Sequence, residues 1–169
     1  KRLIIVRQDS KRTIPLSDIA SVGGRKDVSQ SIASVSGYLT LQLESEDVVV
    51  ISTQETDELK LSFFKSVLQN KTVYIKHPAI EGGVVTDATW EKAKLDVSTD
   101  LLTLTTQTGT LVDIEFTNVS DLEKEKRTVK NKKRSVLSVT HAEETTTVET
   151  YITSSDKRIQ FINEFLSTA

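Results

Sequence analysis

The sequence has no cysteine and no methionine among its 169 residues, and it has only two histidines and one tryptophan. The absence of cysteine excludes a disulfide framework, a zinc–thiolate site, an iron–sulfur cluster and a cysteine nucleophile. No apolar run approaches the ~18 consecutive residues of a membrane span. The 22 Lys and Arg nearly balance the 24 Asp and Glu, whereas nucleic-acid-binding domains are usually strongly basic. We therefore expect a cytoplasmic protein with no integral membrane segment and no nucleic-acid partner.

The residues that most often carry catalysis form no recognisable constellation. His141 and Glu143 are spaced to share one face of a strand, but two ligands do not make a metal site. No Gly-x-Ser-x-Gly nucleophile elbow occurs, and the glycine pairs at 23–24 and 82–83 are not followed by a phosphate-binding motif. The prediction is a protein that is not an enzyme and that has no cofactor, no metal and no catalytic residue.

Short runs of Ile, Val, Leu and Thr, bounded by glycine or charged residues, predict strands along most of the chain. In the segment 39–44 the alternation of leucine with polar residues is strict, which predicts a strand with one buried face. Two segments have apolar residues at helical spacing instead, at 55–70 and 156–167. The expected fold class is therefore mainly β with helices at the ends of two strand-rich regions.

The two halves of the sequence repeat. Residues 14–22 align with residues 114–122 at a constant offset of 100, and every large apolar position matches another. With the offset at 98, Leu41 falls on Val139, Val50 falls on Val148, and the apolar residues of the first helix fall on those of the second. A match that crosses a strand-to-helix transition indicates two copies of one supersecondary unit.

The repeat predicts two domains, at 1–70 and 71–169. The second carries two extra strand candidates, 73–76 and 92–97, before the point where the first begins. We therefore expect tandem pleckstrin-homology-like domains, each a bent antiparallel seven-stranded sheet or barrel capped by a C-terminal helix. The first would lack its initial strands, which residues upstream of Lys1 would supply in a longer protein. The alternative is a β-sandwich with two additional helices.

The densest charge lies in one predicted hairpin, where Asn131 occupies the place of the turn. Its cations are Lys124, Lys126, Arg127, Lys130, Lys132, Lys133 and Arg134. One interpretation is a docking patch for an acidic partner, an anionic lipid surface or a phosphate backbone. The other is an edge hairpin whose lysines discourage pairing with other sheets.

Two long loops are candidates either for partner binding or for packing between the two domains. The segment 23–37 includes Asp27 and Gln30 and is longer than most connections in compact domains. The segment 77–89 is expected to be the loop between the first two strands of the second domain. It has no Lys or Arg and contains Glu81 and Asp87, which argues against phosphoinositide binding there.

Several motifs carry a family resemblance. Residues 11–19 resemble the Ile-Pro-Leu-x-Asp-Ile signature of prokaryotic pleckstrin-homology-like domains, and residues 27–30 and 77–93 resemble the archaeal taxis adaptor family CheF. The resemblance implies a non-catalytic adaptor that links the phosphorylated response regulator CheY to the switch proteins of the archaellum motor. It leaves homodimer formation open. Other interpretations are a membrane-surface module, a general protein-interaction module and a tandem-domain histone chaperone.

Overall fold

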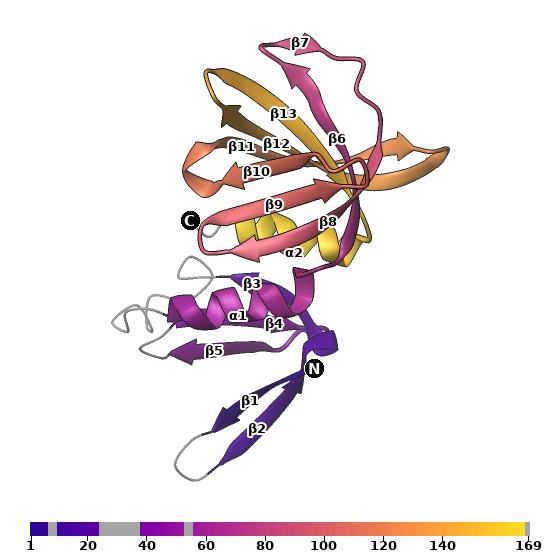
Figure 1. The fold of residues 1–169 in the computed structure, drawn as a ribbon. Coiled ribbons are helices and arrows are strands. Elements are labelled where there is room, and N and C mark those ends of the chain that lie inside the picture. The colour runs from indigo at the N-terminus through magenta and orange to yellow at the C-terminus, as the bar shows by residue number, and fades with distance from the viewer. Residues whose placement is uncertain (7–9, 24–37, 53–55, 168–169) are drawn as a thin grey trace. The chain divides into compact units, whose positions relative to one another are not determined.

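The computed structural model describes residues 1–6, 10–23, 38–52 and 56–167 (Figure 1). It is mainly β with two helices, which confirms the predicted class at that level. The chain divides into two compact units, Lys1–Ser66 and Val67–Ala169. The candidate binding residues Asp27 and Gln30 lie outside the described residues. None of the helices in the described ranges is long and apolar enough to cross a bilayer.

The first unit contains two separate antiparallel sheets. Its elements are β1 (Arg2–Val6), β2 (Lys11–Pro15), η1 (Leu16–Asp18), β3 (Ile19–Gly23), β4 (Tyr38–Leu43), β5 (Val48–Ser52) and α1 (Thr56–Leu68), whose last two residues fall in the second unit. Strands β1 and β2 form one sheet, and β3, β4 and β5 form the other in that order. Ile19, Leu41 and Phe64 are almost inaccessible to solvent, so they form the core of this unit.

The second unit contains one continuous sheet in which every pair of neighbours is antiparallel. Its elements are β6 (Thr72–Glu81), β7 (Val84–Val85), β8 (Glu91–Ser98), β9 (Leu101–Thr106), β10 (Leu111–Glu115), η4 (Phe116–Asn118), β11 (Val119–Val129), β12 (Lys132–Glu143), β13 (Thr146–Thr153) and α2 (Asp156–Ser167). The sheet order is β10-β9-β8-β6-β13-β12-β11, with β7 paired to β6. Within the described residues β10 and β11 are its two ends, and no pairing joins them.

Helix α2 packs against β11 and β12 through its apolar side. Ile159, Ile162 and Phe165 on this helix are buried, and the ring of Phe165 meets that of Phe116 edge-on at 4.8 Å between centroids. Full burial of each such side chain is worth about 1.5–3 kcal/mol. The helical periodicity of the sequence therefore identified the residues that close this core, and the predicted helix bounds 156–167 are confirmed.

The two units follow the same order of elements. Strands β2 and β10, turns η1 and η4, and the first residues of β3 and β11 lie one hundred residues apart, as the sequence predicts. The correspondence extends to an irregularity of the backbone. The pairing of β3 with β4 shifts register between Ile19 and Ser21, and that of β11 with β12 shifts between Val119 and Asp121. A shared bulge is a specific feature of a strand pair, so it supports a common unit.

The predicted match of Val50 to Val148 is wrong. Leu41 pairs with Val49, whereas its counterpart Val139 pairs with Thr150. When the two repeats are aligned by their strand pairing, Val50 therefore corresponds to Tyr151. The reason is that β12 and β13 continue pairing as far as Glu143 and Thr146 before they turn, while β4 and β5 turn earlier, so a single offset cannot hold across this hairpin.

The predicted loop 77–89 is also partly wrong. Strand β6 continues to Glu81 and pairs with β7, so half of this segment is sheet. Gly82 and Gly83 both have positive φ and make the turn between them, a conformation that glycine adopts without steric cost. The side chains of Val84 and Val85 are 68% and 77% exposed. The strand was missed because it has no alternating pattern beyond Lys76.

Candidate partner-binding site

Strands β11 and β12 form a long hairpin that carries the predicted basic cluster. Val129 pairs with Lys132, and Lys130 and Asn131 form the two-residue turn between them. Both turn residues have positive φ, 50° and 66°, which matches the right-handed twist of the flanking strands. Asparagine tolerates this conformation, so the sequence located the turn correctly.

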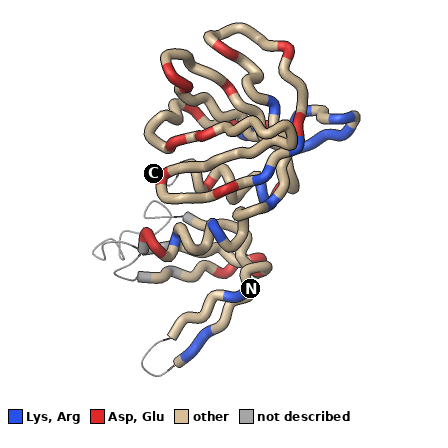
Figure 2. Tube along the Cα trace, in the orientation of Figure 1, with Lys and Arg blue, Asp and Glu red and all other residues tan. Residues whose placement is uncertain are grey.

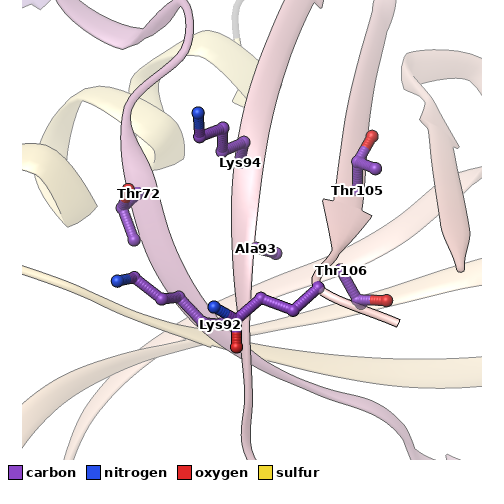
Figure 3. A pocket seen from close by; sticks show the side chains of 7 residues that line it. Thr72, Lys92, Ala93, Lys94, Thr105 and Thr106 are labelled. Atoms are coloured by element: carbon purple, nitrogen blue, oxygen red, sulfur yellow. The ribbon is translucent and has the colours of Figure 1, made fainter. Parts of the chain in front are cut away.

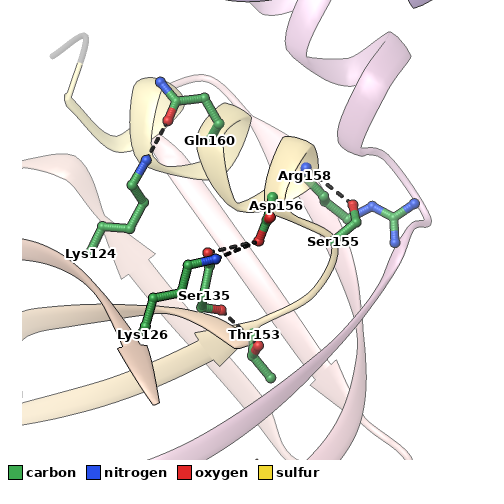
Figure 4. Close-up of polar contacts among 8 residues, drawn as sticks. All are labelled: Lys124, Lys126, Ser135, Thr153, Ser155, Asp156, Arg158 and Gln160. Atoms are coloured by element: carbon green, nitrogen blue, oxygen red, sulfur yellow. Dashed lines mark hydrogen bonds and ion pairs between the residues drawn. The ribbon is translucent and has the colours of Figure 1, made fainter. Parts of the chain in front are cut away.

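Two of the predicted cations bind the helix of their own unit (Figure 4). The Nζ atom of Lys124 donates a hydrogen bond of 2.7 Å to Oε1 of Gln160, and Nζ of Lys126 lies 3.5 Å from Oδ1 of Asp156. These two lysines alternate with Glu125 along β11, so they share the sheet face that α2 covers. Their contacts are internal to the second unit, which makes them weaker candidates for a partner.

Asp156 is the first residue of α2 and joins the helix to β12. Its carboxylate accepts a 2.7 Å hydrogen bond from the hydroxyl of Ser135, and this bond, together with the charge of Lys126, lowers the pKa of Asp156. An ionised carboxylate in the first turn of a helix interacts favourably with the helix dipole. Ser155 precedes it, and its Oγ accepts a bond from the backbone N–H of Arg158, as an N-cap residue does.

Arg127 points to the opposite face of β11. Its guanidinium bonds the carboxylate of Glu125 and lies over the ring of Tyr151, with 4.5 Å from Cζ to the ring centroid. Both contacts satisfy the cation within the second unit, because a planar guanidinium can bond a carboxylate and stack on an aromatic face together. The contact with Tyr151 could not be predicted from the sequence, because it depends on the pairing of β12 with β13.

The remaining cations lie at the end of the hairpin. We call Lys130, Lys132, Lys133 and Arg134 the basic tip; Figure 2 shows Lys and Arg gathered at this end of the hairpin. Lys130 lies 4.4 Å above the ring of Tyr74. For the other three, no carboxylate partner is found in the described part of the chain. Lys132 and Lys133 are exposed and Arg134 is half-buried. The structure therefore divides the predicted cluster into an internally paired base and a tip that is open to a partner.

A polar cluster that the sequence did not predict lies in the same sheet. The hydroxyl of Thr150 on β13 is 2.7 Å from Nδ1 of His77 on β6 and 2.7 Å from Nε2 of His141 on β12. Nε2 of His77 is 3.0 Å from the carboxylate of Glu143. The two imidazole rings stack with 6.0 Å between centroids. His141 and Thr150 are fully buried, so the cluster joins three strands inside the unit.

The hydrogen bonds fix how protons are distributed in this cluster. The Nε2–H of a neutral His77 donates to the carboxylate of Glu143. Nδ1 of the same ring then has no proton, so it accepts a hydrogen bond from the hydroxyl of Thr150. The oxygen of that hydroxyl in turn accepts a hydrogen bond from Nε2–H of His141.

Among the described residues, Nδ1 of His141 makes no well-formed hydrogen bond. Burial, and then the nearby His77, lower the pKa of His141 to about 4, and the backbone of the adjacent Ala142 opposes this lowering of the pKa only weakly. Burial also lowers the pKa of His77, against the opposing charges of Glu143 and Glu81.

The corresponding positions of the first unit are apolar. The register matches His141 to Leu43 and Thr150 to Val49, so the second unit has a hydrogen-bonded pair where the first has aliphatic side chains. The signal in the sequence was this replacement of Leu by His at a repeat position. This replacement could not be interpreted from the sequence, because the partner His77 lies just beyond residue 76, where the predicted strand ended, whereas β6 continues to Glu81.

A pocket of about 340 Å³ lies on the sheet beside β8 (Figure 3). Lys92 and Lys94 line it together with Thr72 and Thr105. The buried hydroxyl among its lining residues belongs to Thr106, which already bonds Thr108 and the backbone of Thr110. The pocket therefore presents no unsatisfied buried group to a ligand, and its lysines serve below as a reference site.

The described residues present a β-rich protein with a charged surface hairpin, and no group of three or more potential metal ligands is found among them. The chain belongs to the family described as Archaeal Chemotaxis signal transduction system protein F, or CheF-arch, whose model matches residues 1–169. The family predicted from the sequence is therefore confirmed.

Two curated proteins of Halobacterium salinarum are similar to this chain. It is 30% identical over 169 residues to Taxis protein CheF1, which covers 99% of this chain and 58% of that relative. It is 28% identical over 172 residues to Taxis protein CheF2, covering 98% of this chain and 59% of the relative. The chain thus spans less than two thirds of the length of either protein. No solved structure matches it.

Proposed function

We propose that this chain is part of a non-catalytic adaptor of archaeal chemotaxis, which links the phosphorylated response regulator CheY to the switch proteins of the archaellum motor. Membership of the CheF family supports a role in chemotaxis. The observation that carries a binding role is the basic tip, where three cations have no acidic partner in the described part of the chain. We place the protein in the cytoplasm, where such partners are found.

The charge of the basic tip defines the kind of partner it fits. Phosphorylation adds about two negative charges to a protein surface. Three unpaired cations on a projecting hairpin increase the rate of encounter with such a surface. The lysines at the base of the hairpin do not contribute in the same way, because Lys124 and Lys126 are already bonded to α2.

The domain organisation is part of the same proposal. We propose that domains 1–70 and 71–169 are both pleckstrin-homology-like. The order of strands in the second unit, its continuous antiparallel pairing and its C-terminal helix support this description. The shared bulge and shared order of elements support extending it to the first unit.

Co-purification with the full-length protein tests the proposed function. The partners are the response regulator, with and without an acyl-phosphate mimic, and the soluble switch proteins of the motor. We expect retention of the regulator to increase with the mimic, and retention of at least one switch protein. Failure to retain any of them would contradict the proposal.

The alternative partner is an anionic membrane surface, since a basic hairpin also binds acidic lipid headgroups. Sedimentation with vesicles of phosphatidylglycerol, compared with neutral vesicles, separates the two. The adaptor function predicts that the protein stays in the supernatant with both. Sedimentation with the anionic vesicles alone would favour the membrane function instead.

A further inference from the structure

Strand β7 has a free edge. It pairs with β6 and with no other strand among the described residues. The N–H of Thr86 donates to the carbonyl of Ala79 at 3.1 Å, and bonded pairs alternate along an antiparallel ladder. The backbone N–H and C=O of Val85 therefore point away from β6. An edge of this kind can pair with a strand from another polypeptide.

The side chains of β7 are exposed and apolar. Val84 is 68% exposed and Val85 77%. Successive side chains of a strand point to opposite faces, so a partner that lies on one face of the hairpin covers only one of the two valines. A strand added beside β7 covers both. Edge strands that remain open to solvent are usually protected by Lys or Pro, and residues 79–91 contain neither.

The surface around this edge is acidic. The N–H of Gly82 donates to the carbonyl of Thr147 at 2.9 Å, so the β6–β7 turn lies beside the start of β13. The exposed carboxylates of these two hairpins are Glu81, Asp87, Glu143 and Glu144. Residues 77–91 and 135–155 contain no Lys or Arg. Within the described ranges, none of the four carboxylates forms an ion pair with a Lys or Arg.

The charge of this surface determines which partner it fits. Electrostatic complementarity favours a cationic segment. The same carboxylates are repelled by an anionic membrane, so the exposed valines do not serve as a membrane anchor. A second copy of this chain could offer its basic tip, but the tip has no apolar side chain and the adjacent Val129 is buried. The valines therefore require a partner that brings both cationic and apolar side chains.

This edge and the basic tip lie at opposite ends of one strand. Strand β12 begins at Lys132 in the tip and ends at Glu143, whose carboxylate is 3.0 Å from Nε2 of His77 on β6. Its 12 residues separate the two ends by roughly 35 Å along the strand. This separation leaves room for a different partner at each end.

We propose that β7 is a docking edge for an extended segment of a partner protein, which pairs with Val85 and carries Lys or Arg together with apolar side chains. The inference deepens the proposed function and rests on it, because an adaptor needs a docking surface for each of its partners. The basic tip fits the phosphorylated regulator, and the acidic edge of β7 fits a switch protein of the motor.

Binding of the soluble switch proteins to the full-length protein tests the proposal. Val84→Thr with Val85→Thr keeps the side chains β-branched, which strands favour, and removes the apolar contact. We expect this variant to raise the Kd for a switch protein about tenfold and to bind the phosphorylated regulator like the wild type. Leu111→Thr is the matched control, because Leu111 is 64% exposed on β10, an end strand of the same sheet. It should bind both partners normally.

The outcomes separate this inference from the proposed function. If the wild type binds a switch protein and the valine variant binds it equally well, the docking edge is overturned and the adaptor function stands. If the wild type binds no switch protein, both are overturned. If the valine variant loses the regulator instead, the assignment of partners to the two ends is wrong.

A charge variant tests the cationic nature of the segment. Asp87→Asn with Glu144→Gln removes two exposed negative charges and leaves the valines in place. We expect weaker binding of the switch protein at low salt and a smaller difference from the wild type at high salt. Equal or tighter binding at low salt would overturn a cationic occupant.

Amide hydrogen exchange in the full-length protein examines the edge itself. The amide of Val85 is expected to exchange fast in the free protein and slowly when a switch protein is bound. The amide of Thr86, which already bonds Ala79, should change little. Slow exchange of Val85 in the free protein would mean that the edge is already covered by the same chain or by a second copy, and would overturn the proposal.

Discussion

The hydroxyl oxygen of Thr150 lies 2.7 Å from Nε2 of the fully buried His141. Because that imidazole is held neutral, it links the stability of the second unit to pH. The pKa of His141 is about 4 in the folded state, below its ordinary value of 6.5. The unfolded chain therefore binds more protons between these two values, and stability falls as the pH falls through this window.

We expect the free energy of unfolding to drop by roughly 2–3 kcal/mol between pH 6.5 and pH 4 because of His141. His141→Gln keeps an N–H donor toward Thr150 but does not titrate, so it should remove most of this slope. Urea titrations at several pH values, followed by fluorescence of the single Trp90, measure it. A variant with the same pH slope as the wild type would contradict the assignment.

His77 provides the comparison for that experiment. Its pKa is also lowered by burial, but Glu143 and Glu81 oppose the shift. His77→Gln is therefore expected to change the slope in the same direction and by less. A larger effect at His77 than at His141 would mean that the burial of His141 is not what dominates the pH dependence.

Ser155 is expected to stabilise the start of α2. Its Oγ accepts the N–H of Arg158, and loss of an N-cap side chain costs about 1 kcal/mol. Ser155→Ala should lower the free energy of unfolding by this amount, whereas Ser155→Asp should retain most of it. The urea midpoints of the two variants measure the difference, and equal values for Ser155→Ala and the wild type would exclude the cap.

Phe165 is expected to be among the most sensitive core positions. It is buried and meets Phe116 edge-on, and truncation of a buried phenylalanine costs about 3–5 kcal/mol. Phe165→Leu keeps most of the volume and should cost much less than Phe165→Ala. Thermal unfolding of both variants checks this, and similar melting temperatures would show that the ring contact is not tightly packed.

The sequence was sufficient for those parts of the fold that have a regular period. The bounds of α2 and the offset between β2 and β10 were predicted correctly, because local periodicity and turn residues determine them. The continuation of β6 was not predicted, since its pairing with β7 and β13 is a non-local property.

The candidate site was predicted as one cluster, and the structure divides it. Sequence proximity brought Lys124 and Lys133 together, but alternation along β11 and the position of α2 assign Lys124 to an internal contact. Neither relation can be obtained from charge counting. The same limit applies to the bridge between His77 and His141, because it forms only when two distant strands flank β13.

The most direct test of the account is the affinity of the full-length protein for the phosphorylated response regulator. Lys132→Glu with Lys133→Glu reverses two charges of the basic tip, and Lys92→Glu with Lys94→Glu makes the same charge change beside the pocket on β8. Titration calorimetry at low salt measures both. We expect Kd to rise roughly tenfold for the tip variant, about 1.4 kcal/mol, with the difference shrinking as salt increases. The pocket variant should remain near the wild type. Equal affinities for the two variants would contradict a docking role for the basic tip.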